Sequence, residues 1–520
     1  MTEPAAATSA PEPPTDSPPA VAAVIVLAAG SGTRMKSKVS KLLHEVAGRS
    51  LVSHAIRSAE SISPEHLVAV VGAMREQVES HLAEVAPEVR TVPQTDDAYG
   101  TGHAVRCALS GIHQSGNDQS GPGQLSGEVV VLGGDVPMLQ QDTLVAMLER
   151  HRAEQAKITI LTARVPDPTG YGRIIRDTDG HVDRIVEQAQ AGPDELAVDE
   201  INSSIYVFDA AVLADGLGRI TNDNPKGEYY LTDVIGLARA DGHTVVAELT
   251  TDTWQTEGVN DRIQLAAVHA EMNRRILHRW MAAGVTILDP SSTWIDDQVE
   301  LTSDVTLHPG TTLKGATVVA EGATIGPDVT LTDCEVGESA VVRRAEAHLA
   351  VIGAGAQVGP YSYLRPGTEL GARSKVGGFV ETKNAKIGDE AKLPHLTYAG
   401  DAVIGAGANI GAGVIFANYD GVAKHTTVIG RDAFVGSDSV LVAPRTVADG
   451  SYVAAGSTVT ADVNPGQLAV ARGQQRNISG WVERKRAGTR TAESARRAAE
   501  GSAAPTDAPG STAQQGKEDQ

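Results

Sequence analysis

The C-terminal half of the chain carries an aliphatic residue at every sixth position, and Gly or Ala often follows it. Three runs keep this period: Leu301, Leu307, Leu313, Val319, Ile325 and Leu331; Ile352, Val358, Leu364, Leu370 and Val376; Ile429, Val435, Leu441, Val447, Val453 and Val459. A period of six is neither the 3.6 of an α-helix nor the two of an isolated strand. It is the repeat of a parallel β-helix whose coil has three flat faces, with one hexapeptide per face. The pattern therefore predicts a C-terminal β-helix built of hexapeptide repeats.

The six-residue period breaks twice, around 380–397 and at 418–427. Interruptions of a solenoid usually form loops on one side of it, often the side that binds a ligand. Both breaks contain polar residues, so we expect two binding loops there.

The N-terminal half alternates short β-rich runs with amphipathic stretches. The expected strands are Val24–Ala28, Leu67–Val71, Val129–Leu132, Ile158–Ala163 and Ile205–Phe208. Strands separated by helices predict an α/β domain, with a mostly parallel sheet covered by helices on both faces. Ligands of such sheets bind at the carboxyl ends of the strands.

These patterns divide the chain into five parts, with a flexible insertion expected at 115–127. Leu265, Val268, Met272, Ile276 and Trp280 are spaced three and four residues apart, which predicts a helical arm between the two domains. The five parts are a disordered tail (1–20), the α/β domain (21–262), a linker helix (263–283), the β-helix (284–483) and a second disordered tail (484–520).

Composition limits the class of function. The formal net charge is −21, which argues against a protein that coats nucleic acid. The two cysteines are far apart in sequence and form neither a disulfide framework nor a zinc motif. The first basic residue, Arg34, follows the apolar run 21–29, so that run is not a signal peptide, and no segment is long enough to span a membrane. We expect a cytoplasmic protein with no membrane partner.

A glycine-rich turn, LAAGSGTRM (27–35), directly follows the first expected strand. Such a turn lets backbone N–H groups approach phosphate oxygens. It matches neither the dinucleotide-binding fingerprint nor the P-loop. Its significance lies in the ordered set of motifs that follows it: Arg34, Lys41, Gln94, Gly100-Thr101-Gly102 and Gly134-Asp135-Val136-Pro137.

With this set of motifs, residues 22–483 resemble the sugar-1-phosphate nucleotidyltransferases, in particular the bifunctional N-acetylglucosamine-1-phosphate uridylyltransferase / glucosamine-1-phosphate N-acetyltransferase family. The resemblance implies a Rossmann-like nucleotidyltransferase fold followed by a left-handed β-helix. It also implies two reactions: acetyl transfer from acetyl-CoA to glucosamine-1-phosphate, and uridylyl transfer from UTP to N-acetylglucosamine-1-phosphate with release of pyrophosphate. The product would be UDP-N-acetylglucosamine, a precursor of cell-wall peptidoglycan.

For the uridylyl site, the resemblance implies a Mg²⁺ ion held by Asp135 and Asn260, with Arg34 and Lys41 on the UTP phosphates. The residues implied for binding UTP or UDP-N-acetylglucosamine are Leu27, Ala28, Ala29, Gly30, Lys41, Gln94, Gly100, Thr101, Gly133, Gly134, Asp135, Gly172, Glu187, Asn202 and Asn260. The chemistry agrees, because attack of one phosphate on another brings two anions together and needs Mg²⁺ and cationic side chains. The chain departs from the family pattern at Ser40, where Pro is usual, and at Ser203-Ser204, where Gly is common; a side chain at the latter could crowd the sugar.

The acyl-transfer candidates lie in FVETKN (379–384) and PHLTYAGD (394–401). Acetyl transfer to an amine needs a base, and the ordinary pKa of histidine suits that role, which makes His395 the candidate. The resemblance implies Arg365, Lys383, Tyr398 and Asn409 as ligands of glucosamine-1-phosphate. It further implies a homotrimer, and it implies that acetyl-CoA is bound by Ala412, Asn418, Tyr419, Lys424, Ser437, Ala455 and Arg472.

Three alternative functions are also conceivable for a chain with these two domains. A nucleotidyltransferase with a purely regulatory β-helix would have no need of a histidine between Arg and Lys residues. A zinc-dependent β-helix enzyme is excluded because His348, His395 and His425 are too far apart in sequence. A non-catalytic scaffold would show no turnover with UTP or acetyl-CoA.

Overall fold

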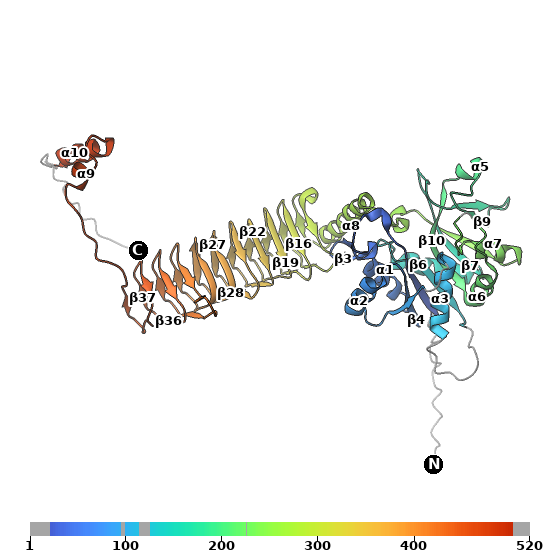
Figure 1. The fold of residues 1–520 in the computed structure, drawn as a ribbon, viewed down its shortest axis with the longest axis horizontal. Helices are drawn as coiled ribbons and strands as arrows, with labels where there is room; N and C mark the ends of the chain where they lie inside the picture. The colour runs from blue at the N-terminus through green and yellow to red at the C-terminus, as the bar shows by residue number, and fades with distance from the viewer. Residues whose placement is uncertain (1–20, 95–98, 114–124, 225, 503–520) are drawn as a thin grey trace, which may run out of the picture.

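The computed structural model describes residues 21–94, 99–113, 125–224 and 226–502 (Figure 1). The molecule is elongated, with an α/β domain at one end and a long coil of strands extending from it. The tail predicted at 1–20 lies outside the described residues, as does most of the insertion predicted at 115–127. No helix within the described part is both long and apolar enough to cross a membrane.

The α/β domain is built on a nine-stranded sheet. Its main path runs in the order β11 (Val245–Thr250), β7 (Ile158–Arg164), β10 (Glu200–Asp209), β6 (Glu128–Gly133), β1 (Ala23–Ala28), β4 (His66–Val71) and β5 (Arg90–Pro93). All neighbours on this path are parallel except β10, which runs antiparallel to both β6 and β7. A hairpin of β8 (Arg173–Arg176) and β9 (Val182–Val186) pairs with β10. The mostly parallel sheet is confirmed.

Alternate residues of β1 face opposite sides of the sheet, because successive side chains of a strand point to opposite faces. Val24 and Val26 belong to the core on one side, and Ala23 and Ile25 to the core on the other. The first core is covered by α1 (Leu51–Glu60), α2 (Arg75–Val85) and α4 (Gln141–Ala153). The second is covered by α3 (Thr101–His113), α6 (Ala210–Arg219) and α7 (Asp233–Ala240).

The linker helix predicted over 263–283 is α8 (Arg262–Ala282). The Asp261 side chain caps it by accepting from the N–H groups of Ile263 and Gln264. Its apolar residues Val268 and Ile276 belong to one buried cluster that continues from the α/β domain into the β-helix. The two domains therefore share a continuous core through α8.

The C-terminal region is a coil of short parallel strands arranged in two long sheets, consistent with the expected left-handed β-helix (Figure 1). Leu307 of β15 (Thr306–Leu307) pairs with Ile325 of β18 (Thr324–Ile325), 18 positions and three hexapeptides later. Both side chains are fully buried. The aliphatic residues of the period thus stack along the axis of the coil.

The first predicted break, around 380–397, is not a loop. Leu364, Thr382 and Ala399 occupy successive coils in register, and all three are fully buried. Thr382 and Ala399 place small side chains where Leu364 has a large aliphatic one, and the Thr382 hydroxyl forms a buried hydrogen bond with Thr368 Oγ1 at 3.0 Å. The prediction of a loop there is wrong, because the coil continues although the large aliphatic residue of the six-residue period is absent.

The second predicted break is a true insertion. Ile410 of β31 (Asn409–Ile410) pairs with Val435 of β34 (Phe434–Val435), a step of 25 residues. The extra residues form a small antiparallel turn in which Tyr419 bridges to Lys424.

The second predicted tail, 484–520, is helical in part. The structure has α9 (Trp481–Lys485) and α10 (Arg490–Ser502), and residues 503–520 lie outside the described part. The expectation of disorder is corrected for 484–502, where Ala-, Arg- and Glu-rich sequence has high helix propensity.

Candidate functional site

The first candidate site lies along the carboxyl ends of β6, β1, β4 and β5. The Gly134 N–H donates to the Leu27 carbonyl at 2.9 Å, and the Gln94 N–H donates to the Val71 carbonyl at 2.7 Å. These bonds bring together the turn after β1 and the segments after β5 and β6. The candidates 27–30, Gln94 and 133–135 therefore share one edge of the sheet.

Gly100 lies at this edge in a conformation that favours glycine, with φ of +113°. A Cβ atom there would lie 2.4 Å from the carbonyl oxygen of Tyr229. The Gly100 carbonyl accepts a hydrogen bond from Gln94 Nε2 at 3.1 Å, and Thr101 Oγ1 accepts one from the Leu231 N–H at 3.0 Å. Gln94, Gly100 and Thr101 thus form one connected loop.

Asp135 and Asn260 meet at the ammonium group of Lys41. Lys41 Nζ lies 2.5 Å from Asp135 Oδ2 and 3.2 Å from Asn260 Oδ1. The Val259 N–H also donates to the Asp135 carbonyl at 2.9 Å, which ties the two segments together. The structure brings these three candidates together from distant parts of the sequence.

The oxygens of Asp135 and Asn260 fit a magnesium ion. Both converge on a single positive charge, the Lys41 ammonium, and both are the hard oxygen donors that Mg²⁺ prefers. Glycines leave room beside them: a Cβ at Gly133 would lie 2.8 Å from Asp135 Oδ1, and one at Gly258 would lie 3.6 Å from Oδ2.

Gly172, Glu187 and Asn202 form a second group. The Asn202 N–H donates to the Gly172 carbonyl at 2.9 Å, and Glu187 Oε1 lies 3.7 Å from where a Cβ at Gly172 would be. Burial raises the pKa of the Glu187 carboxyl. Asn202 Nδ2 donates to the Tyr206 hydroxyl at 2.8 Å, which orients its amide.

The two departures from the family pattern have distinct local structures. Ser204 has φ of +64°, a conformation that glycine adopts at low cost, and its N–H donates to Asn202 Oδ1 at 3.1 Å. The Ser40 N–H donates to Gln77 Oε1 at 2.9 Å, a bond that proline could not make.

Arg34 stands apart from the other candidates. It is exposed on the short 3₁₀ turn Thr33–Met35, and within the described part of the chain it makes no hydrogen bond or ion pair. Gly32, two residues before Arg34, packs on Lys41. A Cβ atom at Gly32 would lie 2.7 Å from the Cβ of Lys41.

Sequence reasoning missed Tyr171 and Glu257. The Tyr171 hydroxyl donates to Glu257 Oε2 at 3.3 Å. Burial and the charges of Glu257 and Asp135 raise the pKa of Tyr171 to about 12. Tyr171 is next to the candidate Gly172 in sequence, and Glu257 is three residues before the candidate Asn260. This proximity in sequence is the signal that could have identified both residues.

The second candidate site lies on the coil, where three cationic side chains gather. The nearby ammonium of Lys424 and the charge of Arg365 lower the pKa of Lys383. Arg365 is held by Glu381, with Nη1 to Oε1 at 2.8 Å. Like charges held this close favour an anion between them.

Tyr398 and Asn418 lie beside this cluster. The Tyr398 hydroxyl lies 2.4 Å, and Asn418 Nδ2 2.7 Å, from where a Cβ at Gly400 would be. Asp401, which sequence reasoning missed, accepts from Asn384 Nδ2 at 2.7 Å and from Asn418 Nδ2 at 2.5 Å. Its partners are 17 residues away on either side, one coil in each direction, and that spacing is the signal that would have identified it.

His395 is exposed at the end of β29 (Lys392–His395) and precedes Tyr398 by three residues. Its carbonyl accepts from Thr397 Oγ1 at 2.9 Å. Asn409 lies on the neighbouring coil, opposite Lys392 in the same sheet, and its side chain makes no hydrogen bond to the described residues of the cationic cluster.

The remaining candidates follow one corner of successive coils. The Asp438 N–H donates to the Ala412 carbonyl, and the Gly456 N–H to the Ser437 carbonyl, each at 2.8 Å. Arg472 Nη1 donates to the Ala455 carbonyl at 2.9 Å. Ala412, Ser437, Ala455 and Arg472 therefore form a ladder along this corner, and strand β32 (Ile415–Ala417) separates it in sequence from the inserted turn that carries Tyr419 and Lys424.

Comparison with known proteins matches both halves of the chain. Residues 24–194 match the MobA-like NTP transferase domain family. The chain is 52% identical over 475 residues to the bifunctional protein GlmU of Streptomyces avermitilis, an alignment covering 91% of this chain and 96% of the relative. Proteins with the same name are 52% identical in Kineococcus radiotolerans, over 93% of this chain and 96% of the relative, and in Micrococcus luteus, over 93% and 98%.

Proposed function

The chain belongs to the family of bifunctional GlmU proteins, and we propose that its two candidate sites divide between them the two transfers of UDP-N-acetylglucosamine synthesis. The protein is a uridylyltransferase and an acetyltransferase that acts on small-molecule substrates. We assign uridylyl transfer to the α/β domain (21–262) and acetyl transfer to the β-helix (284–483).

In uridylyl transfer, a phosphate oxygen of N-acetylglucosamine-1-phosphate attacks the α-phosphorus of UTP, and the bond to pyrophosphate breaks. The meeting of Lys41, Asp135 and Asn260 is the observation that supports this assignment. Mg²⁺ held by Asp135 and Asn260 would neutralise charge on the reacting phosphates. Lys41 and Arg34 would orient the phosphates, and the segments 27–30, 94 and 100–101 would hold the uridine, with Gly172, Glu187 and Asn202 on the sugar.

In acetyl transfer, the amine of glucosamine-1-phosphate attacks the thioester carbonyl of acetyl-CoA. A C–N bond forms, the C–S bond breaks, and CoA leaves as the thiolate. His395 would take the proton from the attacking amine. The cluster of Lys383, Lys424 and Arg365 supports a site for the sugar phosphate, with Tyr398 and Asn409 as further ligands. The ladder from Ala412 to Arg472, with Asn418, Tyr419 and Lys424, would bind acetyl-CoA.

A homotrimer formed through the β-helix is part of the proposal. Val403 and Val428 pair with each other and are exposed on the outer face of one sheet of the coil, and exposed apolar neighbours of this kind favour association. The Glu369–Lys386 ion pair separates them from the exposed Val351 in the same row. The cytoplasm, where UTP and acetyl-CoA are available, is the proposed location.

A single assay tests the assignment. The purified protein is given glucosamine-1-phosphate, acetyl-CoA, UTP and Mg²⁺ in wild-type, His395→Ala and Asp135→Ala forms. Each variant is also supplied with N-acetylglucosamine-1-phosphate, so that uridylyl transfer does not depend on acetyl transfer. We expect the His395 variant to lose CoA release only. The Asp135 variant should lose pyrophosphate release only. Loss of both activities from either change would contradict two separate sites.

A further inference from the structure

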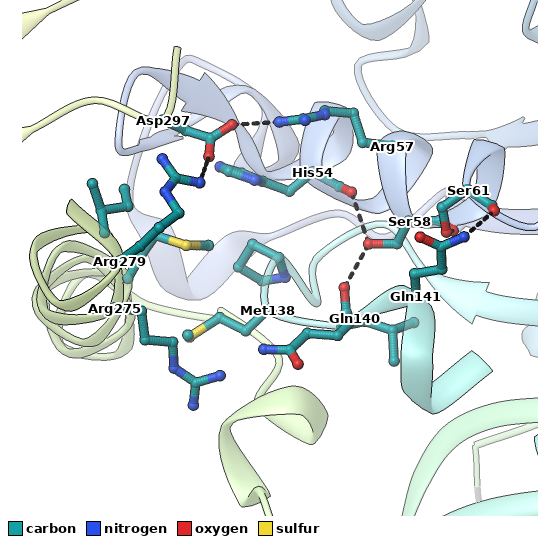
Figure 2. A pocket seen from close by; sticks show the side chains of 14 residues that line it. His54, Arg57, Ser58, Ser61, Met138, Gln140, Gln141, Arg275, Arg279 and Asp297 are labelled. Carbon is teal, nitrogen blue, oxygen red and sulfur yellow. Dashed lines mark hydrogen bonds and ion pairs between the residues drawn. The ribbon is translucent and has the colours of Figure 1, made fainter. Parts of the chain in front are cut away.

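A cavity of about 360 Å³ lies where the α/β domain, α8 and the first coil of the β-helix meet (Figure 2). It is separate from both candidate sites. Its walls come from α1, from the segment after Asp135, and from α8. The lining residues used below are Arg57, Met138, Met272, Arg275, Ile276 and Arg279.

The floor of this interdomain pocket is apolar and its rim is cationic. Met138, Met272 and Ile276 supply its apolar lining. Arg275 and Arg279 line it from α8 (Figure 2). A cavity of this volume suits a small molecule.

The arginines at the rim carry excess positive charge. Asp297 accepts from Arg49 at 2.9 Å and from Arg57, and it lies 3.9 Å from Arg279. Among the described residues, these three guanidinium groups have Asp297 as their one carboxylate partner. Arg275 is different, because Asp252 and Glu271 pair with it fully. The rim can therefore accept an anion at Arg57 and Arg279.

The pocket approaches the proposed metal site most closely through Pro137, which lines it two residues after Asp135. On α8, the helix that begins two residues after Asn260, the first residue to line the pocket is Met272. The hydrogen bond from the Val259 N–H to the Asp135 carbonyl joins these two segments. A molecule between Met138 and Met272 would contact the segment that follows Asp135 and the helix that follows Asn260.

We infer that this interdomain pocket binds a small organic anion, one with an apolar body and a single carboxylate or phosphate group, and that its binding changes the rate of uridylyl transfer. The apolar body packs on Met138, Met272 and Ile276, and the anionic group pairs with Arg279 and Arg57. Binding of the anion to the pocket does not depend on the proposed function, whereas its effect on the rate of uridylyl transfer does.

Methionine methyl NMR tests the binding directly, because the chain has seven methionines and two of them line the pocket. Full-length protein labelled at the methionine methyl carbons is titrated with 2-naphthoate. We expect the Met138 and Met272 signals to shift, with assignment by Met138→Leu and Met272→Leu. Met35, beside the glycine-rich turn of the uridylyl site, distinguishes binding there from binding in the pocket.

Two controls test the role of charge. The neutral isostere 2-naphthamide should bind at least about tenfold more weakly than the anion. Arg279→Glu should cause a similar loss, while Arg274→Glu, an exposed arginine of the same helix outside the pocket, should leave the affinity unchanged. The inference would be overturned if neither the Met138 nor the Met272 methyl signal shifted. It would also be overturned if 2-naphthamide bound as tightly as 2-naphthoate, or if Arg279→Glu bound 2-naphthoate as tightly as the wild-type protein.

The effect on rate is measured as pyrophosphate release with and without saturating 2-naphthoate. We expect a change of at least about twofold in wild type and none in Arg279→Glu. If the methyl signals shift while the rate stays constant, the pocket binds anions but the regulatory half is wrong. If the wild-type protein releases no pyrophosphate even without the probe, the proposed function fails and the binding result is unaffected.

Discussion

The ammonium nitrogen of Lys41 lies 2.5 Å from a carboxylate oxygen of Asp135, although 94 positions separate the two residues. The same nitrogen reaches Asn260, from a third segment of the chain. One lysine thus holds the two proposed metal ligands at a common point, and in the proposed function it orients the phosphates of UTP.

Lys41→Met should lower pyrophosphate release by about 10²–10³-fold, because it removes a cation aimed at charge that develops in the transition state. CoA release should not change. The exposed neighbour Lys38 provides the matched control, since Lys38→Met leaves the cluster intact. Equal effects of the two substitutions would show that Lys41 acts only through general surface charge.

His395→Gln should lower CoA release by about 10²–10⁴-fold, the range for loss of a general base. Pyrophosphate release from N-acetylglucosamine-1-phosphate should be unaffected. His348→Gln, on another coil of the same β-helix, should have no effect on either reaction. Retention of CoA release by His395→Gln would assign the base to another residue.

Lys383 should lose its proton at a lower pH than an ordinary lysine, because Lys424 and Arg365 lower its pKa. Affinity for glucosamine-1-phosphate should therefore fall as the pH rises, and Lys424→Ala should move this fall to higher pH. The measurement is KM for the sugar phosphate across the alkaline range. Lys386→Ala on the same strand, whose side chain pairs with Glu369, should leave the profile in place.

Ser204→Gly should stabilise the α/β domain by about 0.5–1 kcal/mol, because glycine accepts the positive φ that serine adopts at a cost. The urea midpoint of that domain's unfolding transition is the measurement. Ser203→Gly should instead destabilise it, since the Ser203 hydroxyl donates to the Leu161 carbonyl at 2.6 Å. A lower midpoint for Ser204→Gly would mean that the serine side chain has a stabilising contact.

Asp297→Asn should lower stability by about 2 kcal/mol at neutral pH. Burial alone would raise the pKa of Asp297, but the hydrogen bond from Arg49 and the charge of Arg57 outweigh it, so the pKa lies below its ordinary value. Its contribution is therefore fully present above an ordinary aspartate pKa of about 4 and is lost as the pH falls through the lower folded-state pKa.

Thermal unfolding of wild type and Asp297→Asn should consequently differ at pH 7 and converge in strong acid. Asp304→Asn, an exposed carboxylate on the first coils with no ion pair among the described residues, provides the control. A difference that stays constant down to low pH would assign the effect of Asp297 to packing rather than to charge.

The six-residue period predicted the coil from sequence because one inward aliphatic residue per face is a local requirement, as Leu307 and Ile325 illustrate. The same rule failed at Thr382 and Ala399, whose buried side chains are smaller than Leu, Ile or Val. The Thr382 hydroxyl forms a hydrogen bond with Thr368 on an adjacent strand. A pattern of hydrophobic positions cannot predict such a bond.

The candidate site could be predicted only as separate segments. Strand ends placed Asp135 at the correct edge, but its contact with Lys41 depends on how three distant segments pack. Asp401 was overlooked because its importance lies in neighbours one coil before and after it, Asn384 and Asn418. The interdomain pocket is likewise a product of tertiary packing, since its walls come from four separate stretches of the chain.

The stacking of Leu307 on Ile325 also sets a length scale. Neighbouring strands of a sheet are about 4.8 Å apart, so each turn of the coil adds about that much to the rod. Removing the 18 residues of one turn would shorten the separation between the proposed uridylyl and acetyl-transfer sites by one such step and leave the stacking of the remaining turns intact. The distance that a sugar phosphate must diffuse from one proposed site to the other can therefore change only by whole turns of the coil.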